Sequence, residues 1–129
     1  MYSFSVKSLN LLNNPKLNPS LRTLFMEAIK DAPLDFTIIE TVRTKEKQLE
    51  YVTKGASKTM RSRHIPETNS SGFCEAVDAA PYPIDWNDKE RFKKLAAHIL
   101  KKANQLNIPI TWGGNFKTLV DMPHYELKR

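Results

Sequence analysis

The residues of this chain that are best suited to chemistry are its histidines and the acids beside them. The sequence contains three histidines, and His124 lies in the segment DMPHYEL, between Asp121 and Glu126. If HYEL is extended, His124 and Glu126 point to the same side, because side chains alternate along a strand. His124 could then bind a metal ion while Glu126 accepts a hydrogen bond from a neighbouring ligand or from the backbone. The alternative is a surface turn acid followed by an ordinary strand histidine.

A metal site at His124 requires further ligands from distant parts of the chain. Catalytic zinc usually takes three protein ligands and leaves one coordination position for water. The candidates are His64, which begins the polar segment HIPETNSSGF, and Asp78, which lies in the apolar segment AVDAAP. Burying an aspartate among alanines is costly unless the carboxylate is paired or metal-bound. Pairing with an arginine, or the capping of a turn, explains Asp78 equally well from its spacing alone.

Three further residues could belong to such a site, and only Asp121 is assigned a role in it. Pro123 cannot donate to a sheet ladder, so we predict a turn that brings Asp121 back beside the metal-bound water. A carboxylate that is not itself a ligand could accept the proton of that water. His98 shares a helix face with three lysines, so we expect a solvated surface histidine. Cys74 would lie on the same strand face as Asp78, but we expect a cysteine packed in the core.

Length, charge and cysteine content restrict the class of protein. The 129 residues carry 20 Lys and Arg against 14 Asp and Glu, a net charge of +6, and one cysteine, which excludes an internal disulfide. This length suits a single domain spanning residues 1–129. The charge favours an anionic partner such as nucleic acid, anionic lipid or cell-wall polymer. Because no nucleic-acid-binding signature is found, we expect a solvated positive surface and no nucleic-acid partner. We also expect no signal peptide and no transmembrane segment.

The spacing of apolar residues predicts an α+β domain. One helix is predicted between a Ser20 cap and Pro33, a second over residues 44–55, and a third, the longest, after an Asn87–Glu90 capping box. Strands are predicted at 35–42, 74–81, 108–114 and 123–127, and residues 56–73 form a long loop. The first dozen residues are either an arm or a short helix. Because no strict βαβ rhythm appears, we predict a small, mostly antiparallel sheet packed with about three helices.

Together these segments resemble the zinc peptidases that include D-alanyl-D-alanine carboxypeptidases and the L-alanyl-D-glutamate endolysins of tailed phages. The family motif runs Ser-x-His, a glycine, Ala-x-Asp with a proline soon after, and Glu or Asp-x-x-His. Its counterparts here are SRH at 62–64, AVDAAP at 76–81 and DMPH at 121–124. Further matching pieces, in the family's order, are TVRT at 41–44, DWND at 85–88 and WGGNF at 112–116. Each piece alone is weak, but the ordered set is specific and extends from about residue 36 to the C-terminus.

The resemblance implies a role for each matching residue. It implies a Zn²⁺ site on the sheet with its general base, namely His64, Asp78 and His124 as ligands and Asp121 as base. Arg43 matches the family arginine that polarises the scissile carbonyl, a role suited to a planar charge that does not titrate. Ser62 is implied as a supporting residue beside the ligands, and Gln48, on the helix after Arg43, as a residue that helps to hold substrate.

The resemblance also implies a function. It implies a phage endolysin that hydrolyses the L-alanyl-D-glutamate bond of peptidoglycan stem peptides. A D-alanyl-D-alanine carboxypeptidase is the alternative, but it would more often carry glutamate as the base. A wall-binding relative that has lost catalysis is a third possibility, against which the intact Asp121 argues. We expect a monomer that is made in the host cytoplasm and acts on the cell wall after release.

The chain departs from the family pattern in two places. The connection from His64 to Asp78 is longer than usual, and Cys74 stands where the family has a glycine. A longer loop can still return the chain to the same place, because the entropic cost of closure grows slowly with length. It could also reshape access for the substrate. The second departure is GGNF, where an acid and a tryptophan more often follow the glycines, and this change is expected to alter local packing or substrate contacts.

Overall fold

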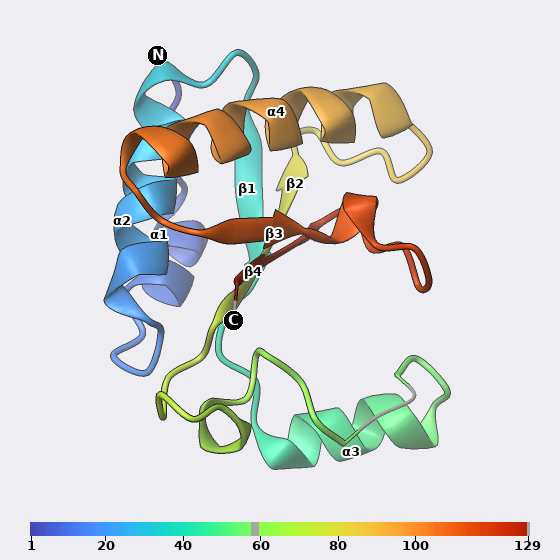
Figure 1. The fold of residues 1–129 in the computed structure, drawn as a ribbon. Helices are drawn as coiled ribbons and strands as arrows, with labels where there is room; N and C mark the ends of the chain where they lie inside the picture. The colour runs from blue at the N-terminus through green and yellow to red at the C-terminus, as the bar shows by residue number, and fades with distance from the viewer. Residues whose placement is uncertain (58–59, 129) are drawn as a thin grey trace.

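A four-stranded antiparallel sheet forms the centre of the protein in a computed structural model that describes residues 1–57 and 60–128 (Figure 1). Its strands are β1 (Phe36–Glu40), β2 (Ala76–Pro81), β3 (Ile110–Trp112) and β4 (His124–Leu127). They lie in the order β1-β2-β4-β3, and every neighbouring pair is antiparallel. The prediction of an α+β fold with an antiparallel sheet is therefore confirmed.

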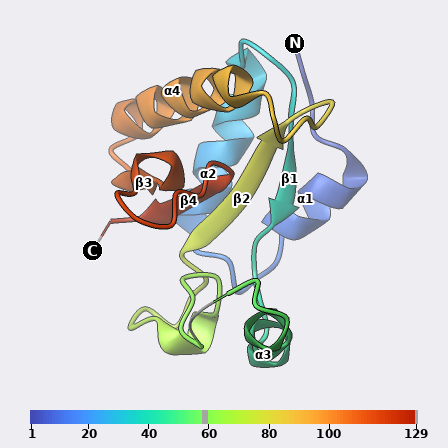
Figure 2. The same cartoon turned by 90° about the vertical axis from the view of Figure 1, so that its right-hand side faces the viewer.

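The described residues form four α-helices: α1 (Val6–Leu12), α2 (Pro19–Ala28), α3 (Lys45–Thr53) and α4 (Lys89–Gln105). The helix α1 is the segment whose structure the sequence left open, so the count is one higher than predicted. Figures 1 and 2 show α3 apart from the other three helices, beyond one end of β1 and β2. None of the helices in the described part of the chain is long and apolar enough to cross a membrane.

Two of the predicted helix caps are wrong by one or two residues. Asn18 caps α2, because its side-chain oxygen accepts a hydrogen bond of 2.9 Å from the backbone N–H of Ser20. The helix begins at Pro19, a position that suits proline because the first turn needs no N–H from it. Asp88, rather than Asn87, caps α4 with a side-chain hydrogen bond of 3.3 Å to a backbone N–H in the first turn.

The hydrophobic core lies between the sheet and the apolar stripes of α2 and α4. Phe25 of α2 is fully buried, and its ring meets that of Tyr125 in β4 edge-on, with the ring centroids 5.8 Å apart. Val77 and Ala79 of β2 belong to the same core. Because side chains alternate along a strand, Asp78 is directed to the opposite face of the sheet. That face carries the candidate metal ligands.

The prediction that His98 is a solvated surface residue is wrong. Its side chain is only 12% exposed and lies against the C-terminal end of α2. The Nε2–H of His98 donates a hydrogen bond of 2.8 Å to the carbonyl oxygen of Ala28, one of the carbonyls that a helix end leaves without an intrahelical partner. The same nitrogen lies 3.3 Å from Asp31. The lysine-rich face of α4 did not reveal this contact, because it depends on how α2 packs across α4.

Candidate metal centre

His64, Asp78 and His124 come together from three different segments of the chain. Asp78 lies within β2, and the strand register places it directly opposite His124, the first residue of β4. The His64 segment is tied to the chain that leaves β1, since the N–H of Arg43 donates to the carbonyl of His64 at 2.9 Å. One ligand atom of each of the three residues lies within 4.8 Å of the others. The structure therefore brings together the three residues that the sequence singled out as ligands.

Each imidazole is held in a fixed orientation by its second ring nitrogen. His64 Nδ1 donates to the carbonyl oxygen of Thr41 at 2.7 Å, and His124 Nε2 lies 2.7 Å from Glu126 Oε1. The other two ring nitrogens, His64 Nε2 and His124 Nδ1, each lie 3.1 Å from Asp78 Oδ1. Histidines that bind metals usually have this kind of carboxylate or carbonyl partner, which fixes the tautomer and aims the free nitrogen.

The electrostatics of the group are those of a site that accepts a cation. Burial opposes the charge of Asp78, but hydrogen bonds from His124 and His64 outweigh it and hold the pKa of this carboxyl well below its usual range. Burial likewise disfavours the imidazolium of His124, but Asp78 and Glu126 outweigh this effect and raise its pKa to about 9. Two imidazoles and one carboxylate fit a zinc ion, which takes nitrogen and oxygen ligands at about 2.0–2.2 Å. We infer that a bound divalent cation would take the place of the proton as the partner of Asp78.

Asp121 is positioned by a tight turn that leads into β4. Its carbonyl oxygen accepts a hydrogen bond of 3.1 Å from the N–H of His124, so the predicted turn at Pro123 is present. The N–H of Asp121 donates to the carbonyl of Gly113 at 3.0 Å. A Cβ atom on Gly113 would lie only 2.2 Å from the carbonyl oxygen of Asp121, so this close approach requires glycine.

The Asp121 side chain lines the same cavity as the three candidate ligands. Asp121 is solvent-accessible as a residue, yet partial burial of its carboxylate raises its pKa above the ordinary value, and the charge of Asp78 adds to this shift. A carboxylate with a raised pKa is a better proton acceptor than one fully exposed to water.

Arg43 is held at the other side of the cavity by several hydrogen bonds. One of its terminal nitrogens donates to Gln48 Oε1 at 2.8 Å and to Ser62 Oγ at 3.3 Å. Gln48 is fully buried in α3, so it is an anchor for the guanidinium. In this structure Gln48 and Ser62 orient Arg43, and the substrate contact that the resemblance implied for Gln48 stays a prediction.

Glu40 and Tyr51 also hold Arg43, although no motif in the sequence includes them. Glu40 Oε1 accepts from Arg43 Nε at 3.1 Å and also from a terminal nitrogen. The ring centroid of Tyr51 lies 4.6 Å from the guanidinium carbon, within the range of a cation–π contact. Glu40 is the last residue of β1. The β1–β2 register shifts between Ile38 and Glu40, and this shift places Glu40 opposite Asp78. No local pattern marks it, because its role depends on strand pairing.

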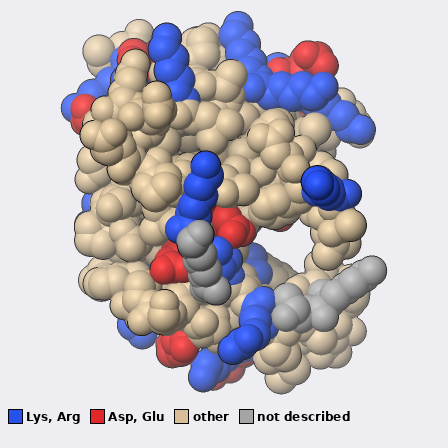
Figure 3. Space-filling view, in the orientation of Figure 1, with Lys and Arg blue, Asp and Glu red and all other residues tan. Residues whose placement is uncertain are grey.

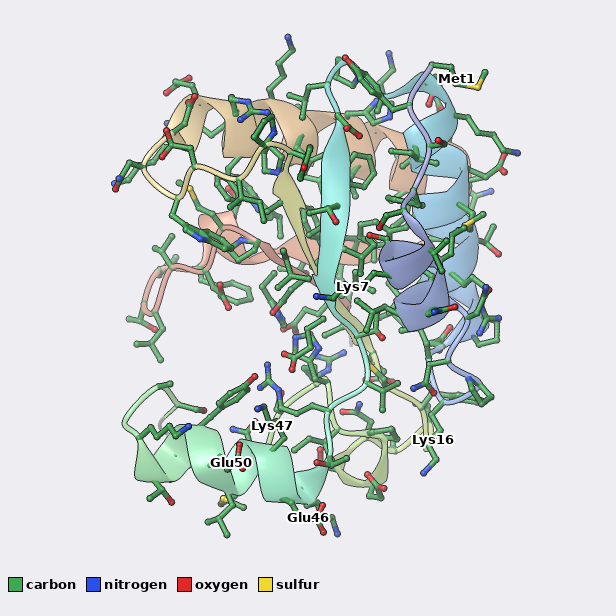
Figure 4. All side chains as sticks on the ribbon, turned by 180° about the vertical axis from the view of Figure 1, so that it is seen from behind. Met1, Lys7, Lys16, Glu46, Lys47 and Glu50 are labelled. Carbon is green, nitrogen blue, oxygen red and sulfur yellow. The ribbon has the colours of Figure 1, made fainter. Side chains whose placement is uncertain are left out.

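The site opens into a cleft between α3 and the segment that precedes β4. The cavity has a volume of about 540 Å³, and besides the residues above it is lined by Ser57, Arg61 and Arg63. Figure 3 shows the surface hollowed on this side, with both acidic and basic side chains beside the hollow. Figure 4 shows Glu46, Lys47 and Glu50 on α3, below the cleft, where Lys47 and Glu50 form an exposed ion pair at 3.3 Å. A cavity of this volume is within the range of about 300–1,000 Å³ that is typical of ligand-binding pockets.

The long connection between His64 and Asp78 returns the chain to the sheet through specific contacts. The side-chain amide of Asn69 donates to the carbonyls of Arg63 at 2.9 Å and Phe73 at 2.8 Å, which closes the loop. Cys74 is fully buried, as expected, and its thiol donates to the carbonyls of Thr41 and Ala76. It is not among the residues that converge as metal ligands in the described part of the chain.

Comparison with known proteins gives concordant results. The family model described as phage L-alanyl-D-glutamate peptidase matches residues 1–128. The L-alanyl-D-glutamate peptidase of Escherichia phage T5 is 29% identical over 119 residues, which are 88% of this chain and 81% of that protein. The L-alanyl-D-glutamate peptidase of Listeria phage A118 is 36% identical over 95 residues, 72% of this chain and 30% of that protein. The crystal structure of the L-Ala D-Glu endopeptidase ChiX from Serratia marcescens superimposes with a TM-score of 0.82 at 28% identity, covering 98% of this chain and 90% of that chain.

Proposed function

The chain belongs to the phage L-alanyl-D-glutamate peptidase family, and we propose that it hydrolyses the L-alanyl-D-glutamate bond of peptidoglycan stem peptides with a Zn²⁺ ion held by His64, Asp78 and His124. The peptidase activity follows from the family. The observation that supports the zinc ion is the convergence of the three ligand atoms within 4.8 Å of one another. The second ring nitrogen of each imidazole is hydrogen-bonded, to Thr41 or to Glu126, which fixes the orientation of the ring.

The cavity residues divide the chemistry of peptide hydrolysis among them. A zinc ion supplies Lewis acidity, which makes water nucleophilic near neutral pH and polarises a carbonyl group. Asp121 accepts the proton of the attacking water, for which its raised pKa suits it, and returns that proton to the leaving amine. Arg43 donates hydrogen bonds to the oxyanion that develops on the scissile carbonyl, the kind of contribution that is usually largest in such catalysis.

The orientation of Arg43 is fixed before the substrate binds. Gln48 and Ser62 hold one terminal nitrogen of the guanidinium, and Glu40 holds Nε and the other terminal nitrogen, so little reorganisation is needed when charge develops on the substrate. Donors that are already oriented stabilise a transition state more than donors that must be ordered during the reaction. This arrangement supports a role for Arg43 that does not depend on its titration.

The proposed substrate indicates where the protein acts and in what form. We infer that residues 1–129 act as one catalytic domain and as a monomer on the bacterial cell wall after release from the host cytoplasm. The net charge of +6 would favour adhesion to an anionic wall polymer. Nucleic acid is not needed as a partner to account for this charge.

The proposed function is tested by metal analysis and by digestion of purified peptidoglycan. The protein should contain one zinc per chain, and chelation should abolish the release of peptides with a new D-glutamate amino terminus, as read by mass spectrometry. Asp121→Asn should keep zinc bound and lose hydrolysis. Release of free D-alanine would instead identify a D-alanyl-D-alanine carboxypeptidase. Full hydrolysis by a metal-free protein would refute the proposed use of zinc.

A further inference from the structure

We propose that Arg63 is a positioning residue for the metal centre, acting on His124 through Glu126. This proposal rests on the metal-dependent function proposed above. Arg63 lies between Ser62 and His64 in the sequence, where neither its type nor its spacing assigned it a role. Its side chain is only 18% exposed and reaches from the His64 segment to the C-terminal end of β4.

The guanidinium of Arg63 joins three groups where β4 ends beside the start of β2. One terminal nitrogen donates to Glu126 Oε2 at 2.8 Å, and Nε donates to Glu75 Oε1 at 3.1 Å. The other terminal nitrogen donates to the carbonyl oxygen of Leu127. A planar fork can meet all three acceptors at once, whereas a single ammonium group cannot. Arg63 is therefore fixed by the sheet itself.

Glu126 connects this arginine to the metal ligand. Its two carboxylate oxygens have different partners: Oε2 binds Arg63, and Oε1 binds His124 Nε2 at 2.7 Å. The carboxylate cannot rotate without breaking one of the two contacts. Because Glu126 holds Nε2, the other ring nitrogen of His124, Nδ1, is directed at Asp78 Oδ1. Arg63 thus fixes the carboxylate that fixes the imidazole.

Arg63 is in turn supported by the long connection that precedes β2. Glu75 Oε2 accepts a hydrogen bond of 2.9 Å from Ser71 Oγ, while its Oε1 accepts from Arg63. The N–H of Glu75 also donates to the carbonyl of Arg63 at 2.8 Å. Contacts from the 65–73 segment therefore reach His124 through a continuous series of hydrogen bonds. This gives the longer connection a physical link to the centre that it borders.

Arg63→Lys tests this proposal because it keeps the positive charge and removes the fork. The Coulomb interaction with a bound cation is then nearly unchanged, so a change in metal affinity reports orientation. Partners that orient a ligand from outside the coordination sphere typically contribute about 10–100-fold in metal affinity. We expect Arg63→Lys to raise the zinc dissociation constant about tenfold, the lower end of that range. The absorption bands of the Co²⁺-substituted protein should also shift, as the ring of His124 becomes less well oriented.

The experiment measures zinc affinity by chelator competition in the full chain, with two further variants. In a Glu126→Ala background, the loss of zinc affinity caused by Arg63→Lys should disappear, because the connecting carboxylate is absent. Arg22→Lys is the matched control, since Arg22 is another partly buried arginine that donates to two backbone carbonyls, at 2.7 and 3.0 Å. A loss above about twofold that depends on Glu126 and is absent in the control supports the proposal.

The opposite results overturn it. A loss below about twofold, a loss that persists in the Glu126→Ala background, or an equal loss in Arg22→Lys would each remove Arg63 from the centre. If the unaltered protein binds no zinc, the proposed function itself fails. If the unaltered protein binds zinc and Arg63→Lys binds it equally well, only the role of Arg63 fails.

Discussion

Replacement of Gly113 by alanine should separate metal binding from catalysis. The added Cβ would lie 2.2 Å from the carbonyl oxygen of Asp121 and 3.0 Å from the Cβ of His124. Real Cβ contacts are essentially never shorter than 3.0 Å, so the backbone of Asp121 must move away by about 0.8 Å. Neither of the two contacted atoms is the far end of a flexible side chain that could rotate away. The displacement therefore moves Asp121, the proposed base.

The size of the effect follows from this displacement. A misplacement of about 1 Å of a catalytic group can cost about 10²-fold in rate, which corresponds to about 2.7 kcal/mol in transition-state free energy. We therefore expect the kcat of Gly113→Ala to fall by about 10²-fold. Zinc affinity should fall much less, because the contact with His124 is only slightly too close and its two side-chain hydrogen bonds remain possible.

The assay compares hydrolysis of purified wall peptides at saturating zinc with the zinc dissociation constant of each variant. Gly55→Ala is the control: Gly55 has a φ of 78°, but a Cβ there would meet nothing within 4 Å. That change should cost about 1 kcal/mol of stability through backbone strain and leave hydrolysis unaltered. A folded, zinc-bound Gly113→Ala protein with full activity would show that the position of Asp121 does not set the rate.

Three other predictions concern the metal, the cysteine and the arginine. Since the neutral imidazole is the ligand, and Asp78 and Glu126 raise the pKa of His124 to about 9 against its burial, zinc affinity should rise about tenfold per pH unit up to that value and then level off, as measured by chelator competition. An affinity independent of pH would contradict the shift. Burial raises the pKa of Cys74 to about 12, so iodoacetamide should modify the unfolded chain but not the native one, as mass spectrometry can test. Arg43→Met should keep zinc bound and lower kcat about 10²–10³-fold, whereas an unchanged kcat would exclude stabilisation of the oxyanion by Arg43.

The sequence by itself determined the helices, the strand alternation and the candidate site residues, because each of these follows from local spacing along the chain. The apolar stripes of α2 and α4 and the alternation around Asp78 follow from the periods of helix and strand, which do not depend on distant residues. The ordered motifs around His64, Asp78 and His124 indicated the family and the candidate metal ligands. The caps of α2 and α4 were displaced by one or two residues, because neighbouring asparagine, serine and aspartate side chains compete for the same role, whereas the predicted start of α3 at Thr44 is correct.

The tertiary structure alone decided which side chains meet across the sheet. Gly113 permits the approach of Asp121 only because the η3 turn (Gly113–Asn115) packs against the turn before β4. The β1–β2 register places Glu40, which holds Arg43, opposite Asp78. Arg63 and Glu126, which form a hydrogen bond, are 63 positions apart in the chain. Contacts between residues so far apart depend on strand order and register, which local periodicity does not specify.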